Sequence, residues 1–552
     1  MKKNHHFARL VIILLFFSIL LLVLIWRMID LMVLDRKFLQ GQGNARSIRT
    51  LDIPAYRGMI TDRNGAPLAV STSVKSVWIN PQEFSPDSHQ LKQLKHLLNI
   101  NPQVLMDKVK QLSSREFIYL TRQIPPTLTK KISNLNIAGV NFQHEFKRYY
   151  PEGESVAHVI GFTNVDDQGL EGIELAYQDW LMGIMGKKRV LKDRIGRIIE
   201  ELDVIKEPRP GHDLPLSIDR RLQYLAYNEL TKTVNEFAAK SGSVIVLDSQ
   251  SGEILAMVNV PSYNPNSRSR YDQDQYRNRA ATDTFEPGSV IKPFSIASAL
   301  ESGLFTPDTI IDTNPSWIMV HGHPVRDGRN YGVLDVTGIL QHSSNVGVTK
   351  LVLASPPENL LNLFSACGFG QRTETAFPGE SSGSMVRARD ANPFVHATLA
   401  FGYGISVTAL QLAKAYLIFA NEGKLMPVSL LHNVNSSPAI QVIKKKTAQQ
   451  VLTMMEAVVS KYGTGRNARI AGYRVAGKTG TSRIAGKNGY EANRHIASFA
   501  GIAPVSNPRF VVVVVIHEPT HRNYYGSSVA APLFAKVMKA ALHLYDIQPD
   551  EQ

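Results

Sequence analysis

The longest run of apolar positions lies close to the N-terminus and is long enough to cross a membrane. Residues Leu10–Trp26 (LVIILLFFSILLLVLIW) contain no charged side chain. As a helix this run would span about 26 Å, close to the hydrocarbon thickness of a bilayer. We predict a retained transmembrane helix over residues 10–29, because the run is longer than the core of a secretory signal and no small-residue cleavage site follows it. A cleaved signal peptide is the alternative.

Basic residues before this run set its expected orientation. Lys2, Lys3 and Arg9 lie in the short tail over residues 1–9. Positively charged flanks tend to stay on the cytoplasmic side of a membrane. We therefore expect a cytoplasmic tail, a single span in the cytoplasmic (inner) membrane and a large extracytoplasmic or periplasmic body. No second apolar run of this length occurs, since the VVVVVI run at 511–516 is only as long as a strand.

The rest of the chain alternates between strand-like and helix-like patterns. Residues 214–237 open as a short strand and continue with apolar residues at helical spacing. Strands, a long helical block and strands again predict an α+β fold, with an antiparallel sheet covered by helices. The segments that read as strands or hairpins lie at 57–71, 242–263, 473–482, 495–504 and 509–519.

These patterns also suggest how the chain is divided into domains. Residues 30–50 are polar and charged, and the following region is rich in turn residues without any phosphate-binding glycine motif. We expect this region to be an elongated, non-catalytic β-rich platform, or pedestal. The predicted parts are a membrane-proximal connector at 30–50, the platform at 51–234, a second domain at 235–545 and a tail at 546–552.

Composition narrows the possible functions. The 552 residues carry a net charge of +14, with neither a long basic run nor an aromatic-basic RNA-binding signature, so nucleic acid is not an expected partner. The single cysteine, Cys367, lies in an apolar context and cannot form a disulfide within the chain. The 16 histidines show no metal-ligand spacing. We expect neither a metal nor an organic cofactor.

Candidate chemistry first appears in FEPGSVIKPF at 285–294, where Ser289 precedes Lys292 by three residues. Side chains at this offset meet on one helix face, and helices often begin after a Pro-Gly break. A serine hydroxyl beside a neutral lysine would be an activated nucleophile. Alone, an S-x-x-K pattern is weak evidence, because it should occur about once or twice by chance in a chain of this length.

Two later motifs strengthen this interpretation. HSSNVGVTK at 342–350 contains Ser343 and Asn345, and AGKTGTS at 476–482 contains Lys478, Thr479, Gly480 and Thr481. Taken singly, Ser343 and Asn345 could be helix-cap residues and the second motif a plain turn. S-x-x-K, S-x-N and K-T-G in this order are the signature of penicillin-recognising serine enzymes. The ordered triple is far less probable by chance than any one of its members.

At this level of detail the chain resembles the class B penicillin-binding proteins, and most of all the cell-division D,D-transpeptidase type (penicillin-binding protein 3, FtsI type). RGMITDRNG and RYYPEGESVAHVIGFT resemble the platform motifs of that family. RNRAATDTFEPGSVIKPF, GILQHSSNVGVTK and YYGSSVAAPLF resemble its active-site and C-terminal blocks. The last block departs from the usual pattern, with Gly526-Ser527 in place of Gly-Gly.

The resemblance implies a role for each site residue. Ser289 would attack the carbonyl between the terminal D-alanines of a donor stem peptide, with Lys292 as its base and Lys478 as a nearby cation that lowers the base's pKa. Backbone N–H groups of Ser289 and Thr481 would hold the oxyanion. Ser343 would relay a proton to the leaving amine, and Asn345 would hold the substrate amide. The terminal carboxylate would be bound by Lys478, Thr479 and Thr481, with Gly480 leaving room for the substrate backbone.

Partners and rival functions follow from the same resemblance. The expected partners are donor and acceptor stem peptides, β-lactams and a membrane-embedded glycan polymerase of the division machinery, contacted partly through the Leu10–Trp26 helix. The alternatives are an elongation-type class B enzyme, a β-lactam sensor and a β-lactamase. An E-x-x-L-N pattern at Glu358–Asn362 is typical of class A β-lactamases, but here it reads as part of an amphipathic helix that follows two prolines.

Overall fold

The computed structural model divides the chain into two compact units. The first comprises residues 1–56, 73–146 and 183–211, and the second comprises residues 57–72, 147–182 and 212–552. The structure describes residues 2–193, 198–268, 271–386, 392–433, 437–486 and 489–551.

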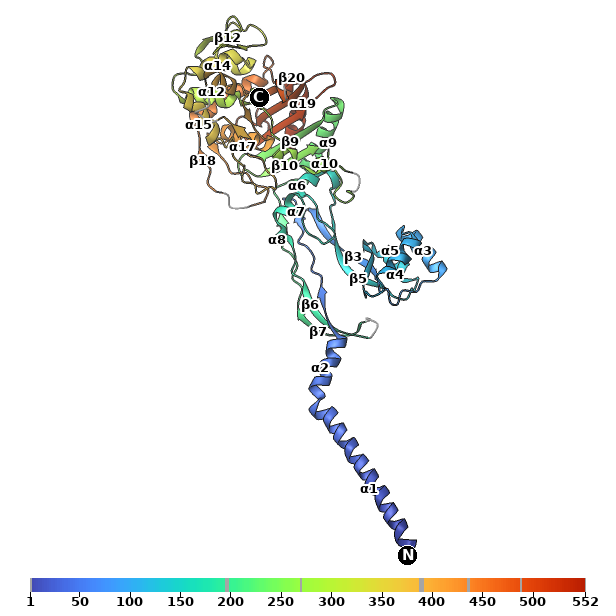
Figure 1. The fold of residues 1–552 in the computed structure, drawn as a ribbon. Helices are drawn as coiled ribbons and strands as arrows, with labels where there is room; N and C mark the ends of the chain where they lie inside the picture. Colours follow the sequence, from blue (N-terminus) through green and yellow to red (C-terminus); the bar gives the residue numbers. More distant parts are fainter. Residues whose placement is uncertain are drawn as a thin grey trace. The chain divides into compact units, whose positions relative to one another are not determined.

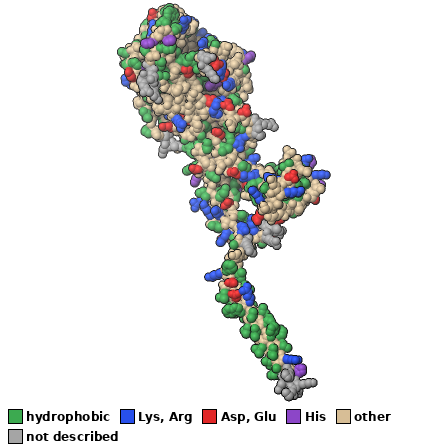
Figure 2. All heavy atoms as spheres, in the orientation of Figure 1, with side chains coloured by type: hydrophobic (Ala, Val, Ile, Leu, Met, Phe, Trp, Pro, Cys, Tyr) green, Lys and Arg blue, Asp and Glu red, His purple; other side chains and the backbone are tan. Residues whose placement is uncertain are grey.

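The first unit begins with the predicted apolar helix. Helix α1 (Lys2–Ile29) continues through a π-helical turn, η1 (Asp30–Leu34), into α2 (Arg36–Ser47). The segment His6–Leu34 is long and apolar enough to cross a membrane. Its large apolar side chains are exposed, and Figure 2 shows them covering the visible face of the helix. A hydrophobic surface of this kind is stable in lipid and costly in water.

The rest of the first unit contains two sheet regions and a helical layer. Strands β1 (Ile48–Ile53), β6 (Gly186–Lys192) and β7 (Ile198–Lys206) form an antiparallel three-stranded sheet. Strand β4 (Ile118–Ile124) pairs with the C-terminal part of β3 (Pro67–Ile79), which also pairs with β5 (Val140–Tyr149). Helices α3 (Ser88–Leu98), α4 (Pro102–Gln111) and α5 (Pro126–Ser133) pack against these strands around a small apolar core.

In the second unit, residues 57–71 form the predicted hairpin. Strand β2 (Ile60–Thr61) pairs antiparallel with β3, and β8 (Leu214–Pro215) joins β2 in parallel. Gly65, in the turn, has a φ of +81°, a conformation that glycine adopts without strain.

Three charged side chains from different motifs meet in the buried interior near this hairpin. Glu174 accepts a hydrogen bond of 2.5 Å from Arg57 Nε and one of 2.6 Å from Arg148 Nε. All three residues are buried, so removing one partner would leave an uncompensated charge inside the protein. This cluster ties together the segments that the sequence places in the non-catalytic platform.

The centre of the second unit is a five-stranded antiparallel sheet. Its strand order is β10 (Ile254–Val260), β9 (Ser241–Asp248), β21 (Phe510–His517), β20 (Gly489–Ala503) and β19 (Ala476–Gly486). The hairpin predicted at 242–263 is confirmed as β9 and β10, and the predicted antiparallel neighbours near the C-terminus are confirmed as β20 and β21. Among the described strands, β19 lies at the edge of the sheet and pairs with β20.

Helices cover both faces of this sheet, which explains the uninterrupted apolar run in β21. Val512 and Val514 belong to a core shared with α9 (Arg220–Glu236) and α19 (Gly526–Leu544). Val511, Val513 and Val515 belong to the core on the opposite face. A strand buried on both faces has no polar side to present. The predicted α+β fold, with helices over an antiparallel sheet, is confirmed (Figure 1).

The second face is covered by the helical block that the sequence predicts between the strands. Its main helices are α12 (Lys292–Glu301), α13 (Val336–His342), α14 (Asn345–Leu353), α15 (Pro357–Ala366), α16 (Pro393–Leu399), α17 (Ala409–Ala420) and α18 (Lys445–Val459). Cys367 follows α15 and is fully buried, which raises the pKa of its thiol and makes it a core residue.

The remaining elements of the second unit are short. Its short helices are η2 (Gly153–Ser155), α6 (Ala157–Ile160), α7 (Gly172–Ala176), α8 (Gln178–Leu181), α10 (Gln273–Tyr276), α11 (Arg279–Thr282), η3 (Gly288–Ile291) and η5 (Arg466–Ala468). Its short strands are β11 (Ile310–Asp312), β12 (Trp317–Val320), β13 (His323–Arg326), β14 (Val333–Asp335), β15 (Ser384–Met385), β16 (Ile405–Ser406), β17 (Lys424–Leu425) and β18 (Ile440–Gln441).

Candidate active site

The Ser289 motif forms a tight turn that leads into a buried helix. Gly288 begins the 3₁₀ turn η3 with a φ of +56°, and the chain then enters α12 at Lys292. Two contacts fix this turn: the Gly288 N–H donates to Gly402 O at 3.1 Å, and the Tyr416 hydroxyl donates to Val290 O at 2.6 Å. Ser289 is half-buried, and Lys292 is fully buried. The serine can therefore be reached from outside, while the amine is held inside.

The second motif lies at the junction of α13 and α14. Ser343 ends α13 in the left-handed conformation, with a φ of +61°. Ser344 caps α14, since its hydroxyl accepts from the Gly347 N–H at 2.9 Å. The left-handed residue turns the chain sharply, which places Ser343 and Asn345 on either side of the buried cap residue. Ser343 is thus the C-cap of α13 and Ser344 the N-cap of α14, while Asn345 is the first residue of α14.

Asp327, which the sequence did not single out, holds this junction in place. Its carboxylate accepts from Ser344 Oγ at 2.6 Å and from the Val346 N–H at 3.0 Å. A carboxylate at the N-terminus of a helix is favoured by the helix dipole. Asp327 follows β13 in a loop, and no motif marks it.

The third motif lies on the edge strand β19. Lys478 is fully buried, and Thr479 Oγ1 lies 3.3 Å from Thr464 Oγ1. A Cβ on Gly480 would lie 2.3 Å from Ser498 Oγ and 2.9 Å from Val290 Cγ1, so any side chain there would collide with the strand next to it and with the Ser289 turn. The unpaired edge of β19 leaves backbone groups free to bind an extended peptide.

The C-terminal block also reaches this strand. The Gly526 N–H donates to Thr481 Oγ1 at 3.0 Å. A Cβ on Gly526 would lie 2.3 Å from Gly480 O, so the glycine allows close approach of the two backbones. The sequence departure at Ser527 thus comes directly after a residue that contacts the K-T-G motif.

The three motifs meet at the hydroxyl of Ser343. Lys292 Nζ donates to Ser343 O at 2.6 Å, to Asn345 Oδ1 at 2.7 Å and to Ser343 Oγ at 3.1 Å. Lys478 Nζ donates to Ser343 Oγ at 3.0 Å. The hydroxyl therefore bridges two amines from segments far apart in the chain. Within the described part of the chain Ser289 Oγ makes no hydrogen bond, which leaves it available to a ligand.

Burial makes both amines weak bases. It lowers the pKa of Lys292 to about 7, against a smaller opposing effect of the Asp327 carboxylate, which favours the charged form. Burial, together with repulsion from Lys292, lowers the pKa of Lys478 well below its ordinary value. Repulsion between two charged amines is mutual, so a protonated Lys478 would also disfavour a protonated Lys292.

Glu286, three residues before Ser289, is a second side chain that sequence reasoning missed. Its Oε1 accepts from the Gly404 N–H at 2.9 Å and from the Tyr490 hydroxyl at 3.1 Å, while its buried Oε2 has no hydrogen-bond partner. Burial raises the pKa of this carboxyl group. In the sequence, only its position inside the FEPGSVIK motif points to a role for Glu286 in the site. The residue connects the Ser289 turn to β20 and to the loop before β16.

The described residues contain no group of three or more His, Cys, Asp or Glu side chains arranged to hold a metal ion.

Known proteins are similar to this chain over almost its whole length. The penicillin-binding protein transpeptidase domain matches residues 242–539, and the penicillin-binding protein dimerisation domain matches residues 52–216. The chain is 40% identical over 550 residues to the probable peptidoglycan D,D-transpeptidase PbpC of Pseudomonas aeruginosa, covering 100% of this chain and 97% of that one. It is 41% identical over 532 residues to the peptidoglycan D,D-transpeptidase FtsI of Escherichia coli, covering 96% and 90%.

Solved structures of similar proteins extend this agreement to the fold. Penicillin-binding protein 3 of Mycobacterium tuberculosis, in complex with aztreonam, is 26% identical with a TM-score of 0.71, covering 91% of this chain and 98% of that one. The transpeptidase domain of penicillin-binding protein 3 from Burkholderia pseudomallei is 38% identical with a TM-score of 0.57, covering 61% and 98%.

Proposed function

The chain belongs to the class B penicillin-binding proteins of the penicillin-binding protein 3 type, and we propose that it cross-links peptidoglycan stem peptides through an acyl-enzyme on Ser289. The observation that carries this assignment of residues is the position of Ser343 Oγ, which accepts hydrogen bonds from both Lys292 and Lys478. Lys292 follows the half-buried Ser289 by three residues. The motifs that supply these residues are 54 and 135 positions apart along the chain (343 − 289 and 478 − 343).

In the acylation step, neutral Lys292 takes the proton of Ser289 as Oγ bonds to the carbonyl carbon between the two terminal D-alanines. A pKa of about 7 leaves a large neutral fraction of Lys292 at neutral pH. The C–N bond then breaks, and the departing D-alanine amine receives a proton through the Ser343 hydroxyl. An amine of a second stem peptide then attacks the acyl carbon and loses a proton to Lys292. The C–Oγ bond breaks, and Lys292 returns that proton to Ser289 Oγ.

The geometry of β19 suits the donor peptide. Lys478, Thr479 and Thr481 offer an amine and two hydroxyls for its terminal carboxylate, whose charge would favour the protonated form of Lys478. The edge of β19 opposite β20 can pair with the peptide backbone. Asn345 holds the substrate amide in this proposal. The backbone N–H groups of Ser289 and Thr481 stabilise the oxyanion, where loss of one donor typically costs about 100- to 1000-fold in rate.

Labelling with a fluorescent penicillin, followed by mass spectrometry of the labelled peptide, tests the assignment. A β-lactam resembles the donor, so we expect a long-lived adduct on Ser289. The adduct should be lost in Ser289→Ala and kept in the control Ser527→Ala, which removes a hydroxyl from the neighbouring C-terminal block. A label on another serine would refute the assigned nucleophile, and rapid hydrolysis of the drug would favour a β-lactamase.

The position of Glu358 argues against the β-lactamase alternative. It is exposed in the first turn of α15, and in the described structure its carboxylate has no hydrogen bond or ion pair. A carboxylate that activates the deacylating water must reach the acyl-serine. Nothing in the described structure connects Glu358 with Ser289, Lys292 or Ser343.

We further propose that the protein acts in septal wall synthesis, anchored in the inner membrane with its N-terminus in the cytoplasm. The apolar helix α1 and the basic residues before it support this orientation. The predicted partner is a membrane-embedded glycan polymerase, contacted through Leu10–Trp26. Replacing this segment with an unrelated transmembrane helix should impair septation and leave penicillin labelling intact. Normal division after the exchange would contradict the proposed contact, and failed elongation would favour the elongation-type alternative.

A further inference from the structure

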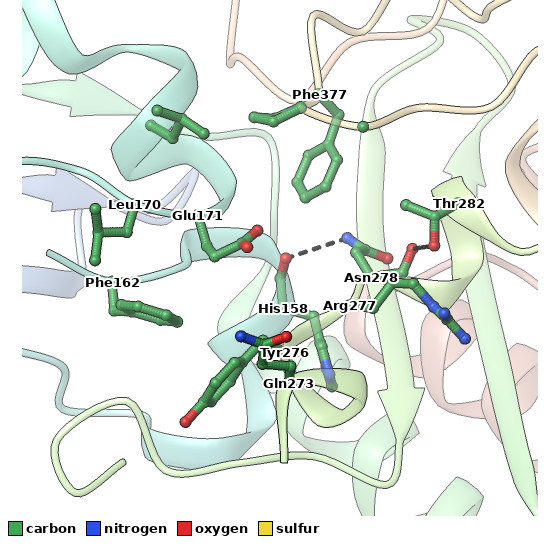
Figure 3. A pocket seen from close by; sticks show the side chains of 13 residues that line it. His158, Phe162, Leu170, Glu171, Gln273, Tyr276, Arg277, Asn278, Thr282 and Phe377 are labelled. Atoms are coloured by element: carbon green, nitrogen blue, oxygen red, sulfur yellow. Dashed lines mark hydrogen bonds between the residues drawn. The ribbon is translucent and has the colours of Figure 1, made fainter. Parts of the chain in front are cut away.

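The second unit contains a large hollow separate from the serine-lysine site. It has a volume of about 820 Å³ and lies between residues 158–175, residues 273–282 and the loop at 377–379. Figure 3 shows Glu171 and Phe377 pointing toward the same space from different segments, with Leu170 and Phe162 along one side. A volume of this size falls in the range of ligand sites. The proposed transpeptidase chemistry makes no use of it.

The Glu171 carboxylate is the unusual feature of this hollow. Among the described residues it makes neither a hydrogen bond nor an ion pair. Partial burial raises the pKa of its carboxyl group, and no neighbouring cation opposes this shift. Two cations lie near the hollow. Arg277 is paired with Asp274 at 3.1 Å and with Asp283 at 2.8 Å. The Arg268 guanidinium lies 4.0 Å from the centre of the Phe162 ring and donates to Thr163 O at 3.0 Å. The acid therefore has a charge without a partner and apolar walls beside it.

A second hollow adjoins the first along helices α7 and α8. It has a volume of about 540 Å³, shares Leu175 with the first hollow and is lined by Asp179 and Trp180. Leu170, Leu175 and Trp180 are 45%, 41% and 50% exposed, which is unusual for such large apolar side chains. Asp179, like Glu171, has no ion pair or hydrogen bond to another described side chain. We call these two adjoining hollows the acidic groove.

We propose that the acidic groove binds a peptide segment of another protein that combines lysine or arginine with apolar residues. Two adjoining hollows with a shared apolar wall fit a chain several residues long better than one small molecule. The two carboxylates without partners complement basic side chains, and the exposed leucines and tryptophan complement apolar ones. The chain as a whole carries a charge of +14, so an acidic, apolar surface is a local exception.

Binding of a labelled model peptide tests this proposal. The probe is a fluorescent octapeptide, (Leu-Lys)₄, with (Leu-Glu)₄ and (Leu-Ser)₄ as comparison peptides. The protein is the full chain in nanodiscs of zwitterionic phosphatidylcholine, and the readout is fluorescence anisotropy. We expect saturable binding of (Leu-Lys)₄ at least about tenfold tighter than that of either comparison peptide.

A double variant shows whether the groove is the site. Glu171→Gln with Asp179→Asn should weaken (Leu-Lys)₄ binding about tenfold or more, because two opposite charges are lost. The matched control, Glu207→Gln with Asp308→Asn, removes two exposed acids outside the groove and should bind as the wild type does. Both double variants should keep normal penicillin labelling of Ser289, which shows that they fold and separates this test from the test of the proposed function.

Other outcomes would overturn the proposal. Equal binding of the three peptides, or equal affinity in the two double variants, would mean that the carboxylates recognise no basic segment. Cadaverine at millimolar concentration serves as a competitor. If cadaverine displaced the peptide with the affinity of the peptide itself, the groove would be a site for small amines instead. Self-association of the wild type that is lost in the groove variant would identify a second copy of the chain as the occupant.

Discussion

The acylation rate of Ser289 should follow the protonation state of Lys292. Because burial lowers the pKa of this amine to about 7, about half of the molecules carry the neutral base at pH 7. An ordinary lysine, with a pKa near 10.4, would be neutral in only about one molecule in 2,500 at that pH. Between pH 6 and pH 8 the neutral fraction of Lys292 rises from about one tenth to about nine tenths. The second-order rate of acylation should therefore rise about tenfold and then level off.

The rate is measured with a fluorescent penicillin on the full-length protein at constant ionic strength, from pH 5.5 to pH 9. The penicillin carboxylate stays ionised throughout, so the profile reports on the protein. A half-maximum near pH 7 is expected. A flat profile, or a half-maximum above pH 9, would show that a buried and largely neutral Lys292 is not the base.

Substitution of Asp327 tests the physical origin of this midpoint. The Asp327 carboxylate favours the charged form of Lys292, so Asp327→Asn should move the midpoint to lower pH by roughly half a unit to one unit. The amide keeps one acceptor oxygen for the N-terminus of α14. The control is Asp335→Asn, which alters the cap of the neighbouring α13, where the carboxylate accepts from the Gly338 N–H. A midpoint that rises in Asp327→Asn, or moves equally in both variants, would refute the reasoning.

Three further predictions concern the same site. Gly480→Ala should slow acylation about a hundredfold, because the new methyl group would lie 2.3 Å from Ser498 Oγ, 2.9 Å from Val290 Cγ1 and 3.0 Å from the Pro287 carbonyl oxygen, and so would press on the Ser289 turn; a rate close to that of the wild type would show that these neighbours yield without cost. Ser343→Ala should slow acylation by about a hundredfold or more, because both lysines lose the hydroxyl that joins them; unchanged kinetics would exclude Ser343 from the proton path. Lys292→Met should abolish acylation and raise the thermal unfolding midpoint relative to the wild type by more at pH 6 than at pH 9. The sign follows from the low pKa of Lys292 in the folded protein, because between about pH 7 and pH 10 the unfolded chain binds more protons than the folded one. The stability of the wild type therefore rises with pH across that window. A difference between the two unfolding midpoints that does not depend on pH would contradict the lowered pKa.

Local sequence patterns were sufficient to predict the framework of this site. The hairpin at 242–263 and the strands near the C-terminus follow from alternation and turn residues. The run at 511–516 was recognised as a strand from its length, although its two-sided burial became visible only with the helices in place. Short motifs identified Ser289, Ser343 and Lys478 because their spacing is rare in combination.

The contacts that complete the site depend on the tertiary fold and left no comparable pattern. Asp327 lies 16 positions before Ser343 (343 − 327) in a loop, and its carboxylate reaches the start of α14 only because β12 and β13 present that loop there. Tyr416 anchors the Ser289 turn from α17, more than a hundred residues away. The sequence also could not show that both amines are fully buried, because their burial depends on helices and strands from distant parts of the chain.

The two buried amines explain why the site is assembled from three distant segments rather than one. An amine beside a serine in a single exposed helix would stay protonated, because water stabilises the ammonium ion. Lys292 and Lys478 become weak bases only where α12, the α13–α14 junction and β19 close around them and exclude water. The same closure leaves Ser343 Oγ as their common neighbour, so a proton taken from Ser289 has a short hydrogen-bonded route between the two amines. If the proposed function holds, the carboxylate of the arriving peptide would favour the charged form of Lys478. The charge on Lys478 would then repel the proton held by Lys292, which would move toward the leaving amine.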